Sequence, residues 1–405
     1  MTTADAADGP TPLSTPISAG IVASLVGFTS SFAVVLTGLR AVGASPTEAA
    51  SGLLALCVTQ AVGMMWLARR YRQPITLAWS TPGAALLAGT GVVVGGWPAA
   101  VGAFVTVGVL ILLTGLWPRL GALVSRIPVP LAQAMLAGVL LPLCAAPVVA
   151  FADSPAQVAP VVLVWLVVLR FNARWAVPAA FAAAAAVIAA DLIGGDTPIA
   201  ASDLIPRIDW TVPHWSWQAT VGIAVPLYIV TMASQNIPGT TVMASFGFRI
   251  PWRASMTVTG TGTVLGAFAG GHTINLAAIS AALSANPSAH PDPKRRWVAA
   301  FSAGSSYLVL ALLSTALATL VAAAPAGVVE TVAGLALLGT LAASLFGALE
   351  HASDREATVL TFLVAASGLT FAGIGSAFWA LVVGLVVRAI LRRQSPAMPA
   401  TDATG

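Results

Sequence analysis

Long apolar runs, separated by short stretches rich in Pro, Gly or charge, recur along this 405-residue chain. A helix needs about 20 mostly apolar residues to span the hydrocarbon core of a bilayer. Hydrophobic residues make up 58% of the sequence and Asp, Glu, Lys and Arg only 8%, against roughly a quarter charged in soluble domains. So few charges cannot cover the surface of a water-soluble protein of this size. The sequence therefore predicts an all-α membrane protein with the lipid bilayer as its surroundings.

Several functional classes are disfavoured because the residue patterns that they need are missing from the sequence. The two cysteines, Cys57 and Cys144, lie in apolar runs, which is typical of inert buried thiols rather than of a disulfide framework or a thiolate metal site. The formal net charge is +4, but no basic stretch is interleaved with aromatic residues, so a nucleic-acid partner is not expected. No Ser/His/Asp or paired-carboxylate constellation falls at membrane depth, so we expect no enzyme.

Two other patterns suggest ligand sites only superficially. Gly260 and Gly266 belong to a glycine-rich run, but this run follows a membrane helix start and no strand, so close helix packing is expected instead of nucleotide binding. The acidic cluster that contains Glu350, Asp354 and Glu356 falls in a loop and is expected to be a solvated turn. We therefore expect neither a cofactor nor a metal.

Fourteen candidate transmembrane segments can be marked, seven in each half of the chain. In the first half they cover residues 17–39, 47–68, 74–88, 97–116, 129–148, 155–170 and 176–193. In the second half they cover residues 217–236, 252–269, 272–285, 297–320, 327–348, 356–371 and 375–391. The predicted organisation is an N-terminal tail (1–15), a first repeat (16–194), an extracytoplasmic linker (195–214), a second repeat (215–393) and a C-terminal tail (394–405).

Basic residues test this count, because Lys and Arg are retained on the cytoplasmic side of a membrane protein. With the N-terminus inside, sixteen of the 18 basic residues fall in cytoplasmic loops, and only Arg40 and Arg207 fall outside. Omitting either short segment, 74–88 or 272–285, would invert every later loop and destroy this asymmetry. We therefore expect a protein of the cytoplasmic (inner) membrane with both termini in the cytoplasm.

Tryptophans lie at many segment ends, where an indole ring can sit at the headgroup level of the bilayer. The expected interfacial anchors are Trp66, Trp97, Trp117, Trp175, Trp217, Trp252 and Trp297. Trp79 differs because it lies inside a short segment. For Trp79, plain packing and contact with a substrate are both open.

The third segment of each half is too short to cross the bilayer as a plain helix. Residues 75–78 read Ile-Thr-Leu-Ala and residues 274–277 read Ile-Asn-Leu-Ala, each after a break rich in Pro or Gly. An extended stretch followed by a half-helix would cover the distance. Seven crossings per half place the halves in opposite orientations, so matched breaks indicate an inverted repeat. Irregular backbone at membrane depth is tolerated where it is buried in protein or lines a cavity, so the breaks mark the expected binding site.

The residues at these breaks suit an anion. Ser80 and Thr81 precede Pro82, which is the chemistry of a helix start, and Asn275 lies just before the second half-helix. Free N–H groups and the positive dipole ends of two facing half-helices can bind a carboxylate. No Lys or Arg lies in the interior of a segment, away from its ends, so we expect a small anion held without a fixed cation. The same polar groups could instead only satisfy the backbone at the breaks.

The chain resembles the benzoate membrane transport (BenE) family over about residues 16–393. The resemblance rests on residues 73–86, on Gln-Asn-Ile-Pro-Gly at 235–239 and on Gly-Gly-His-Thr-Ile-Asn-Leu-Ala-Ala at 270–278. It implies uptake of benzoate coupled to protons. It also implies an architecture similar to nucleobase permeases and sulfate-permease-type carriers. In that architecture a core domain (segments 1–4 and 8–11) faces a gate domain (segments 5–7 and 12–14), and the substrate sits between segments 3 and 10.

Carried onto this sequence, the resemblance gives ten candidate substrate-binding residues. They are Ser80, Thr81, Asn275 and Ala278 around the carboxylate, Phe28, Phe32, Trp79 and Tyr228 for the aromatic ring, and Gln235 and Asn236 for a polar wall. Nucleobase permeases carry carboxylates in segments 8 and 10, where this chain has neutral residues. That difference suits an anionic substrate and leaves the proton carrier open.

His272 is the candidate for proton coupling, because it lies next to the second break and an imidazole changes charge near neutral pH. It could equally be a loop histidine at the outer surface, or the proton could arrive on the substrate.

A carrier for another small anion or a nucleobase is an alternative function. An ion channel is an alternative from a different class, although it would need a continuous polar pore. A homodimer stays open as the assembly.

Overall fold

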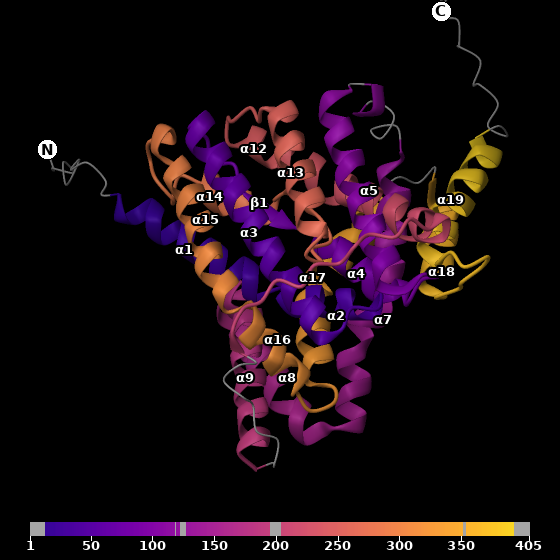
Figure 1. Cartoon of the computed structure of the whole chain (residues 1–405), viewed down its shortest axis with the longest axis horizontal. Coiled ribbons are helices and arrows are strands. Elements are labelled where there is room, and N and C mark those ends of the chain that lie inside the picture. Colours follow the sequence, from indigo (N-terminus) through magenta and orange to yellow (C-terminus); the bar gives the residue numbers. More distant parts are fainter. Residues whose placement is uncertain (1–12, 118, 122–126, 195–203, 351–353, 393–405) are drawn as a thin grey trace, which may run out of the picture.

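Helices occupy the predicted apolar ranges. The computed structural model describes residues 13–117, 119–121, 127–194, 204–350 and 354–392 (Figure 1). Residues 1–12 of the predicted N-terminal tail (1–15), the predicted C-terminal tail (394–405) and residues 195–203 of the predicted linker lie outside the described residues.

The first half contains eight described helices and one short strand. They are α1 (Ser14–Thr29), α2 (Phe32–Ala41), α3 (Pro46–Tyr71), β1 (Leu77–Trp79), α4 (Thr81–Thr90), α5 (Gly96–Leu116), α7 (Val129–Asp153), α8 (Pro155–Phe171) and α9 (Ala173–Gly194). The second half begins with one long helix that contains two π-helical turns. Its parts are α10 (Trp217–Ala219), η2 (Thr220–Ala224), α11 (Val225–Thr231), η3 (Met232–Asn236) and α12 (Ile237–Ser245). The elements that follow are α13 (Trp252–Ala267), β2 (Ile274–Leu276), α14 (Ile279–Ala285), η4 (Pro293–Arg295), α15 (Trp297–Leu312), α16 (Ser314–Ala322), α17 (Val328–Leu349), α18 (Arg355–Ala366) and α19 (Ser376–Arg392).

Seven helices among the described residues are long and apolar enough to span a membrane. They cover Ser14–Ala41, Pro46–Tyr71, Gly96–Leu116, Val129–Asp153, Ala173–Ile193, Trp217–Ser245 and Val328–Leu349. The helices α15 and α16 form an eighth candidate that bends by 52°. The others are shorter than a straight crossing needs, so the fourteen-crossing topology stays a prediction.

Local chemistry explains where α3 begins. The Ser45 hydroxyl accepts a hydrogen bond from the Glu48 N–H (3.3 Å), and the Glu48 carboxylate accepts one from the Ser45 N–H (2.8 Å). This reciprocal pair satisfies two backbone donors that a helix start leaves free. Pro46 follows at the first helical position, where its missing N–H costs nothing.

The two predicted breaks pair with each other. β1 and β2 run antiparallel, with Leu77 opposite Leu276 and Trp79 opposite Ile274, and they pack against α3 and α13 inside the bundle (Figure 1). The half-helices α4 and α14 start directly after the strands. Each extended stretch therefore has its backbone hydrogen-bonded by the other, which removes the cost of free N–H and C=O groups at membrane depth. The extended stretch and half-helix were predicted, but the pairing was not.

Close packing of α5 against α13 depends on glycine. A Cβ atom placed on Gly260 would lie 2.5 Å from the backbone nitrogen of Leu112, and one placed on Gly108 would lie 2.8 Å from the backbone nitrogen of Val264. Real Cβ atoms do not approach backbone this closely, so the two backbones touch only because neither residue has a side chain. The predicted packing role of the glycine-rich run is confirmed.

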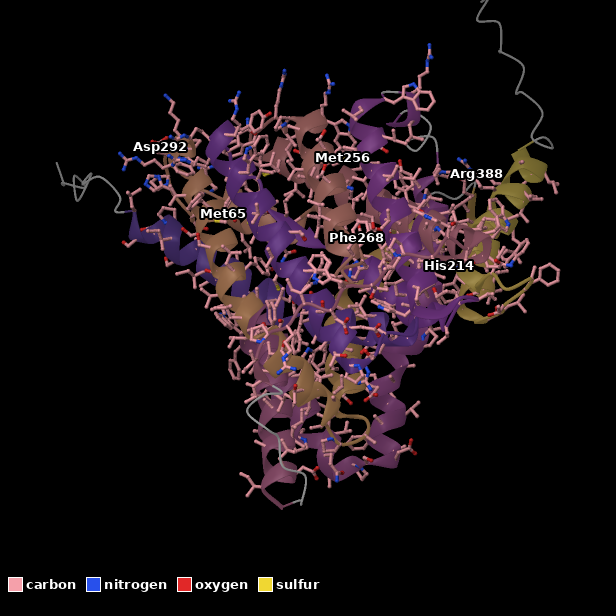
Figure 2. The ribbon with its side chains drawn as sticks, in the orientation of Figure 1. Met65, His214, Met256, Phe268, Asp292 and Arg388 are labelled. Carbon is pink, nitrogen blue, oxygen red and sulfur yellow. The ribbon has the colours of Figure 1, made fainter. Side chains whose placement is uncertain are left out.

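The described part of the linker is hydrogen-bonded to α5 and to the end of α13. This contact corrects the prediction that Trp97 is an interfacial anchor. Trp97 is only 5% exposed, and its indole N–H donates to the Thr211 hydroxyl (2.9 Å). The Thr211 N–H donates to the Phe268 carbonyl, and the His214 N–H to the Pro98 carbonyl (both 2.9 Å). Phe268 and His214 are labelled in Figure 2. The anchor prediction for Trp97 is wrong because the linker covers this helix end and supplies the indole with a protein partner.

The expectation of a solvated acidic turn is also wrong for Asp354. This residue is 4% exposed, and its carboxylate accepts a 2.9 Å hydrogen bond from the guanidinium of Arg388. Arg388 is labelled in Figure 2. Arg388 lies on α19, so the ion pair joins the start of α18 to that helix. Sequence spacing could not show it, because the two partners are 34 residues apart.

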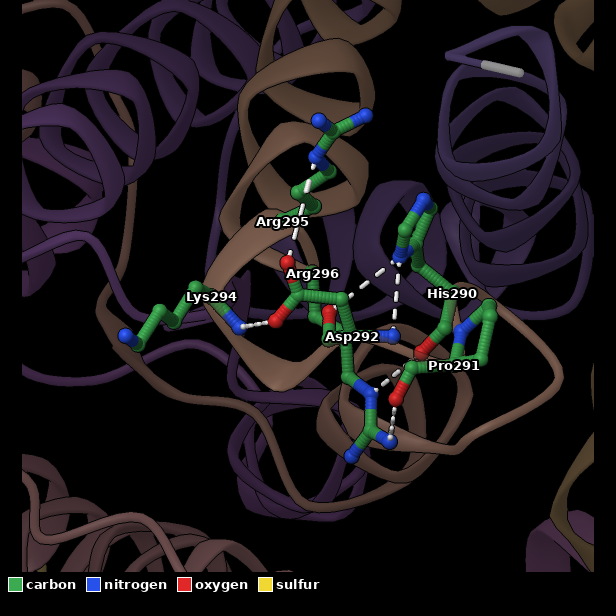
Figure 3. Close-up of polar contacts among 6 residues, drawn as sticks. All are labelled: His290, Pro291, Asp292, Lys294, Arg295 and Arg296. Atoms are coloured by element: carbon green, nitrogen blue, oxygen red, sulfur yellow. Dashed lines mark hydrogen bonds and ion pairs between the residues drawn. The ribbon is translucent and has the colours of Figure 1, made fainter. Parts of the chain in front are cut away.

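Arg296 organises the loop between α14 and α15 (Figure 3). Its guanidinium donates to the carbonyls of His290 (2.7 Å), Ala285 (2.8 Å) and Pro291 (3.2 Å). Ala285 ends α14, where a positive charge is favoured by the helix dipole. Burial lowers the pKa of Arg296 and the Asp292 carboxylate opposes that shift, but a guanidinium stays charged at neutral pH.

Replacing Arg296 by alanine should lower the melting temperature of the protein in detergent by several degrees. Three carbonyls would lose a charged donor, and such hydrogen bonds contribute on the order of 1.5–3 kcal/mol each before relaxation and water offset part of the loss. Arg295→Ala is the matched control, because Arg295 forms a 3.9 Å pair with Asp292 in which both side chains are nearly half exposed. Equal melting temperatures for the two variants, followed by circular dichroism, would contradict this role.

Candidate functional site

A cavity of about 130 Å³ lies at the two breaks. It is bounded by α1, the turn between α1 and α2, β1, the start of α4, η3, residues 277–283, α15 and α17. A buried cavity of about 150 Å³ is known to hold one benzene molecule, so this space is close to the size of one aromatic ring. Four of the ten predicted binding residues line it, namely Trp79, Thr81, Gln235 and Ala278.

The first half-helix supplies Thr81 to the cavity and uses Ser80 for its own start. The Ser80 hydroxyl accepts hydrogen bonds from the Gly83 N–H (3.1 Å) and from the Thr231 hydroxyl (3.0 Å). Ser80 is fully buried and is not among the lining residues. Of the two hydroxyl residues, only Thr81 is therefore positioned to meet a ligand in the cavity.

At the second half-helix, Ala278 lines the cavity and Asn275 does not. Asn275 lies opposite Ala78 in the strand pair and is fully buried. Its side-chain amide makes no hydrogen bond within the described part of the chain, so Asn275 is an unsatisfied polar group behind the cavity wall. Ser280, on the first turn of α14, lines the cavity although it was not predicted.

Three of the four aromatic candidates, Trp79, Phe28 and Phe32, pack against one another in a row that extends behind the cavity wall. Trp79 is 3% exposed, and its indole N–H donates to the Ser31 hydroxyl (2.9 Å). The Trp79 ring meets Phe28 edge-on with centroids 5.6 Å apart, and Phe28 stacks on Phe32 at 5.3 Å. Phe28 and Phe32 do not line the cavity. They fix the position of Trp79, whose edge-to-face contacts are favourable.

Tyr307 contributes the second aromatic side chain of the cavity and was missed by sequence reasoning. It comes from α15, and its ring meets Trp79 edge-on with centroids 5.9 Å apart. Its neighbours in the sequence are small or apolar, so no local pattern distinguishes Tyr307 from ordinary packing. Ser30 and Ser31, which also line the cavity, had a signal, because they form a polar pair inside an apolar run.

The remaining predicted residues on the eighth segment point elsewhere. The Tyr228 hydroxyl hydrogen-bonds with the Thr114 hydroxyl on α5. The side-chain Oδ1 of Asn236 accepts a hydrogen bond from the Leu276 N–H (2.9 Å), and its side-chain Nδ2 donates to the Met232 sulfur (3.2 Å). Neither residue lines the cavity, whereas their neighbour Gln235 does. Asn236 therefore holds β2 in place and is not part of the polar wall.

His272 is fully buried and lies outside the cavity lining. Its Nδ1 accepts a hydrogen bond from the Thr273 N–H (2.6 Å), and its Nε2 has no partner in the described residues. Because Nδ1 is an acceptor, the proton of a neutral ring sits on Nε2. The ring faces Phe104 edge-on at 6.4 Å. The alternative of a loop histidine at the outer surface is wrong.

Comparison with known proteins points to one family and one fold. The sequence model described as "Benzoate membrane transport protein" (BenE) matches residues 10–390. The chain is 37% identical over 376 residues to "Inner membrane protein YdcO" of Escherichia coli (strain K12), covering 92% of this chain and 95% of that one. It is 28% identical over 378 residues to "Benzoate membrane transport protein" of Acinetobacter baylyi, covering 92% and 94%. Its fold is similar to the transmembrane domain of a cyanobacterial bicarbonate transporter, BicA, with a TM-score of 0.58, 15% identity, and coverage of 94% of this chain and 97% of that one.

Proposed function

This chain belongs to the benzoate membrane transport protein family, and we propose that it is a secondary active transporter that imports benzoate or a related aromatic carboxylate together with protons. The observation that carries this proposal is the ring-sized cavity at the paired breaks, which combines an aromatic wall with uncharged polar groups. Such a mixture suits a ligand with one apolar ring and one polar end.

We place the carboxylate of the substrate near Thr81 and Gln235. Thr81 begins α4, where the helix dipole favours a negative charge, and its hydroxyl can donate a hydrogen bond. The Gln235 side-chain amide can donate another. Among the described residues that line the cavity there is no Lys, Arg, Asp or Glu. The anion therefore meets neither a fixed cation that would hold it too tightly nor a carboxylate that would repel it.

Transport follows from the position of the cavity between two groups of helices. Its lining comes from α1, α4, α14 and α15, which the family resemblance assigns to the core, and from Ala336 and Thr340 on α17, which it assigns to the gate. Movement of core against gate would expose the cavity to each side in turn, as in transporters with inverted repeats. We propose the corresponding topology of seven plus seven crossings, in the inner membrane with both termini in the cytoplasm.

The proton has two routes in this proposal. His272 could carry it, although the ring would need to reach water from its buried position. Alternatively, benzoate could bind as its protonated form, since carboxylic acids have pKa values of about 4 and a small neutral fraction always exists. Both routes move one proton with one anion, and the net movement of charge is zero.

The proposal predicts saturable benzoate counterflow in liposomes that contain the purified protein. Vesicles loaded with unlabelled benzoate should transiently concentrate labelled benzoate from outside without any pH gradient. Neutral benzoic acid crosses lipid by itself and follows a pH gradient, so net accumulation alone does not report on the protein. Counterflow avoids this problem, and empty liposomes provide the baseline.

Coupling to protons is tested by comparing two driving forces in the same vesicles. The saturable, protein-dependent initial rate should rise when the outside is acidified and should not respond to a membrane potential set by potassium and valinomycin. A rate that follows the membrane potential and ignores the pH gradient would refute symport and indicate a uniporter. Flux that never saturates would favour a channel.

A further inference from the structure

We propose that the Tyr307 hydroxyl makes this protein select aromatic carboxylates with a second polar substituent on the ring, such as hydroxybenzoates, over benzoate itself. This inference rests on the proposed function and assigns a specificity-determining residue within the same cavity. It starts from a polar atom for which the protein provides no partner.

Tyr307 lines the cavity, and its hydroxyl has no hydrogen-bond partner in the described part of the chain. The residue is 4% exposed. A buried tyrosine hydroxyl normally has a partner. The contrast with Tyr228 is direct, because the hydroxyl of that buried tyrosine is paired with Thr114. A group in the cavity is therefore the natural partner of the Tyr307 hydroxyl.

The two serine hydroxyls in the turn between α1 and α2, which also lines the cavity, already donate hydrogen bonds within the protein. The Ser30 and Ser31 hydroxyls both donate to the Gly27 carbonyl, at 3.0 Å and 3.1 Å. Ser31 additionally accepts from the Trp79 indole. The hydroxyls of Ser30 and Ser31 therefore have no proton left to donate to a ligand. The neighbouring Tyr307 hydroxyl can both donate a hydrogen bond to a ligand and accept one from it.

The Tyr307 hydroxyl lies close to α1. A Cβ atom added to Gly27 would lie 2.8 Å from the Tyr307 hydroxyl oxygen, so the ring of Tyr307 reaches the helix backbone. Its other side meets Trp79, the aromatic wall for a bound ring. With the carboxylate placed at Thr81 and Gln235, the proposal places a ring substituent against the Tyr307 hydroxyl. A ring hydroxyl there would both donate and accept, whereas the C–H of benzoate leaves the tyrosine unpaired.

The inhibition of benzoate counterflow by each hydroxybenzoate isomer tests this selectivity. In the unmodified protein, at least one isomer should inhibit labelled benzoate counterflow with an inhibition constant about tenfold lower than that of unlabelled benzoate. Tyr307→Phe should abolish that preference, so that the inhibition constant of the preferred isomer becomes equal to that of benzoate measured in the same variant. Tyr71→Phe is the matched control, because Tyr71 ends α3 and lies outside the cavity lining; it should behave as the unmodified protein does.

A second pair of variants distinguishes a displaced Tyr307 hydroxyl from a protein that does not fold. Gly27→Ala should weaken counterflow, because the new methyl group would collide with the Tyr307 hydroxyl. Adding Tyr307→Phe removes the colliding oxygen, so the double variant should regain benzoate counterflow without regaining the preference. If Gly27→Ala is equally defective in both backgrounds, the contact is not what positions the hydroxyl, and the inference fails.

Two further outcomes would overturn the inference while leaving the proposed function intact. One is equal inhibition constants for benzoate and all three isomers in the unmodified protein. The other is a Tyr307→Phe variant in which the constants for benzoate and hydroxybenzoates rise by the same factor, which would place the hydroxyl at the carboxylate. Absence of benzoate counterflow in the unmodified protein would overturn the proposed function, and this inference with it.

Discussion

Replacing Trp79 by alanine should abolish saturable benzoate transport, whereas replacing Trp66 by alanine should leave it nearly unchanged. Trp79 forms the aromatic wall of the cavity and packs against Phe28 and Tyr307. Removing a buried aromatic side chain lowers the free energy of unfolding by about 3–5 kcal/mol. If the free energy of substrate binding fell by the same amount, the dissociation constant would rise by about a hundredfold or more. Trp66 is 49% exposed on α3, so its removal changes mainly contact with lipid.

The measurement is the initial counterflow rate per amount of monodisperse protein after reconstitution. Trp79→Phe helps to separate the ring from its polar atom, because it keeps an aromatic wall and removes the hydrogen bond to Ser31. This variant should retain part of the transport with a raised KM. A Trp79→Ala protein with unchanged KM and rate would show that the cavity at the breaks is not the transport site.

Replacing Gly260 by leucine should prevent the protein from accumulating in folded form. The side chain would begin 2.5 Å from the Leu112 backbone nitrogen and 2.8 Å from the Gly108 carbonyl oxygen. Backbone atoms cannot move aside as a flexible side chain can, so α13 and α5 would have to separate along their contact. Overpacking typically costs about 1–3 kcal/mol when side chains can adjust, and a backbone collision in a tight helix pair should exceed that range.

Gly339→Leu is the matched control for size and hydrophobicity. A Cβ atom on Gly339 would meet nothing within 4 Å, and the residue is exposed on α17. The two variants can be compared by size-exclusion profiles in mild detergent. Similar monodisperse yields for Gly260→Leu and the control would refute the close packing of α5 and α13.

Sequence reasoning located the breaks but could not supply the partners of their residues. Trp79 and Thr81, which breaker residues and helix-start chemistry indicated, and Ala278, which the family resemblance implied, all line the cavity, and their contacts with a substrate stay predictions. The pairing of β1 with β2 joins residues about two hundred positions apart, and no local pattern encodes it. Tyr307 escaped notice for the same reason, since only packing against α1 and Trp79 distinguishes it.

The eighth segment shows a second physical limit. Two π-helical turns, η2 and η3, lie within this helix. Each such turn shifts the angular position of later residues away from a regular repeat of 3.6. A helical wheel therefore cannot tell which of Tyr228, Gln235 and Asn236 faces the cavity. In the structure only Gln235 does.

The antiparallel pair β1–β2 bears on how such a chain can have arisen. Each strand lies in one half and finds its backbone partner only in the other half. At membrane depth an unpaired strand is too costly to persist. If the proposed inverted repeat is correct, an ancestor consisting of one half would have been stable only as two copies inserted in opposite directions, each completing the other's third segment. Under the proposed inverted repeat, gene fusion would have preserved an assembly that was already obligatory, and the two halves could then diverge into the different walls of one cavity.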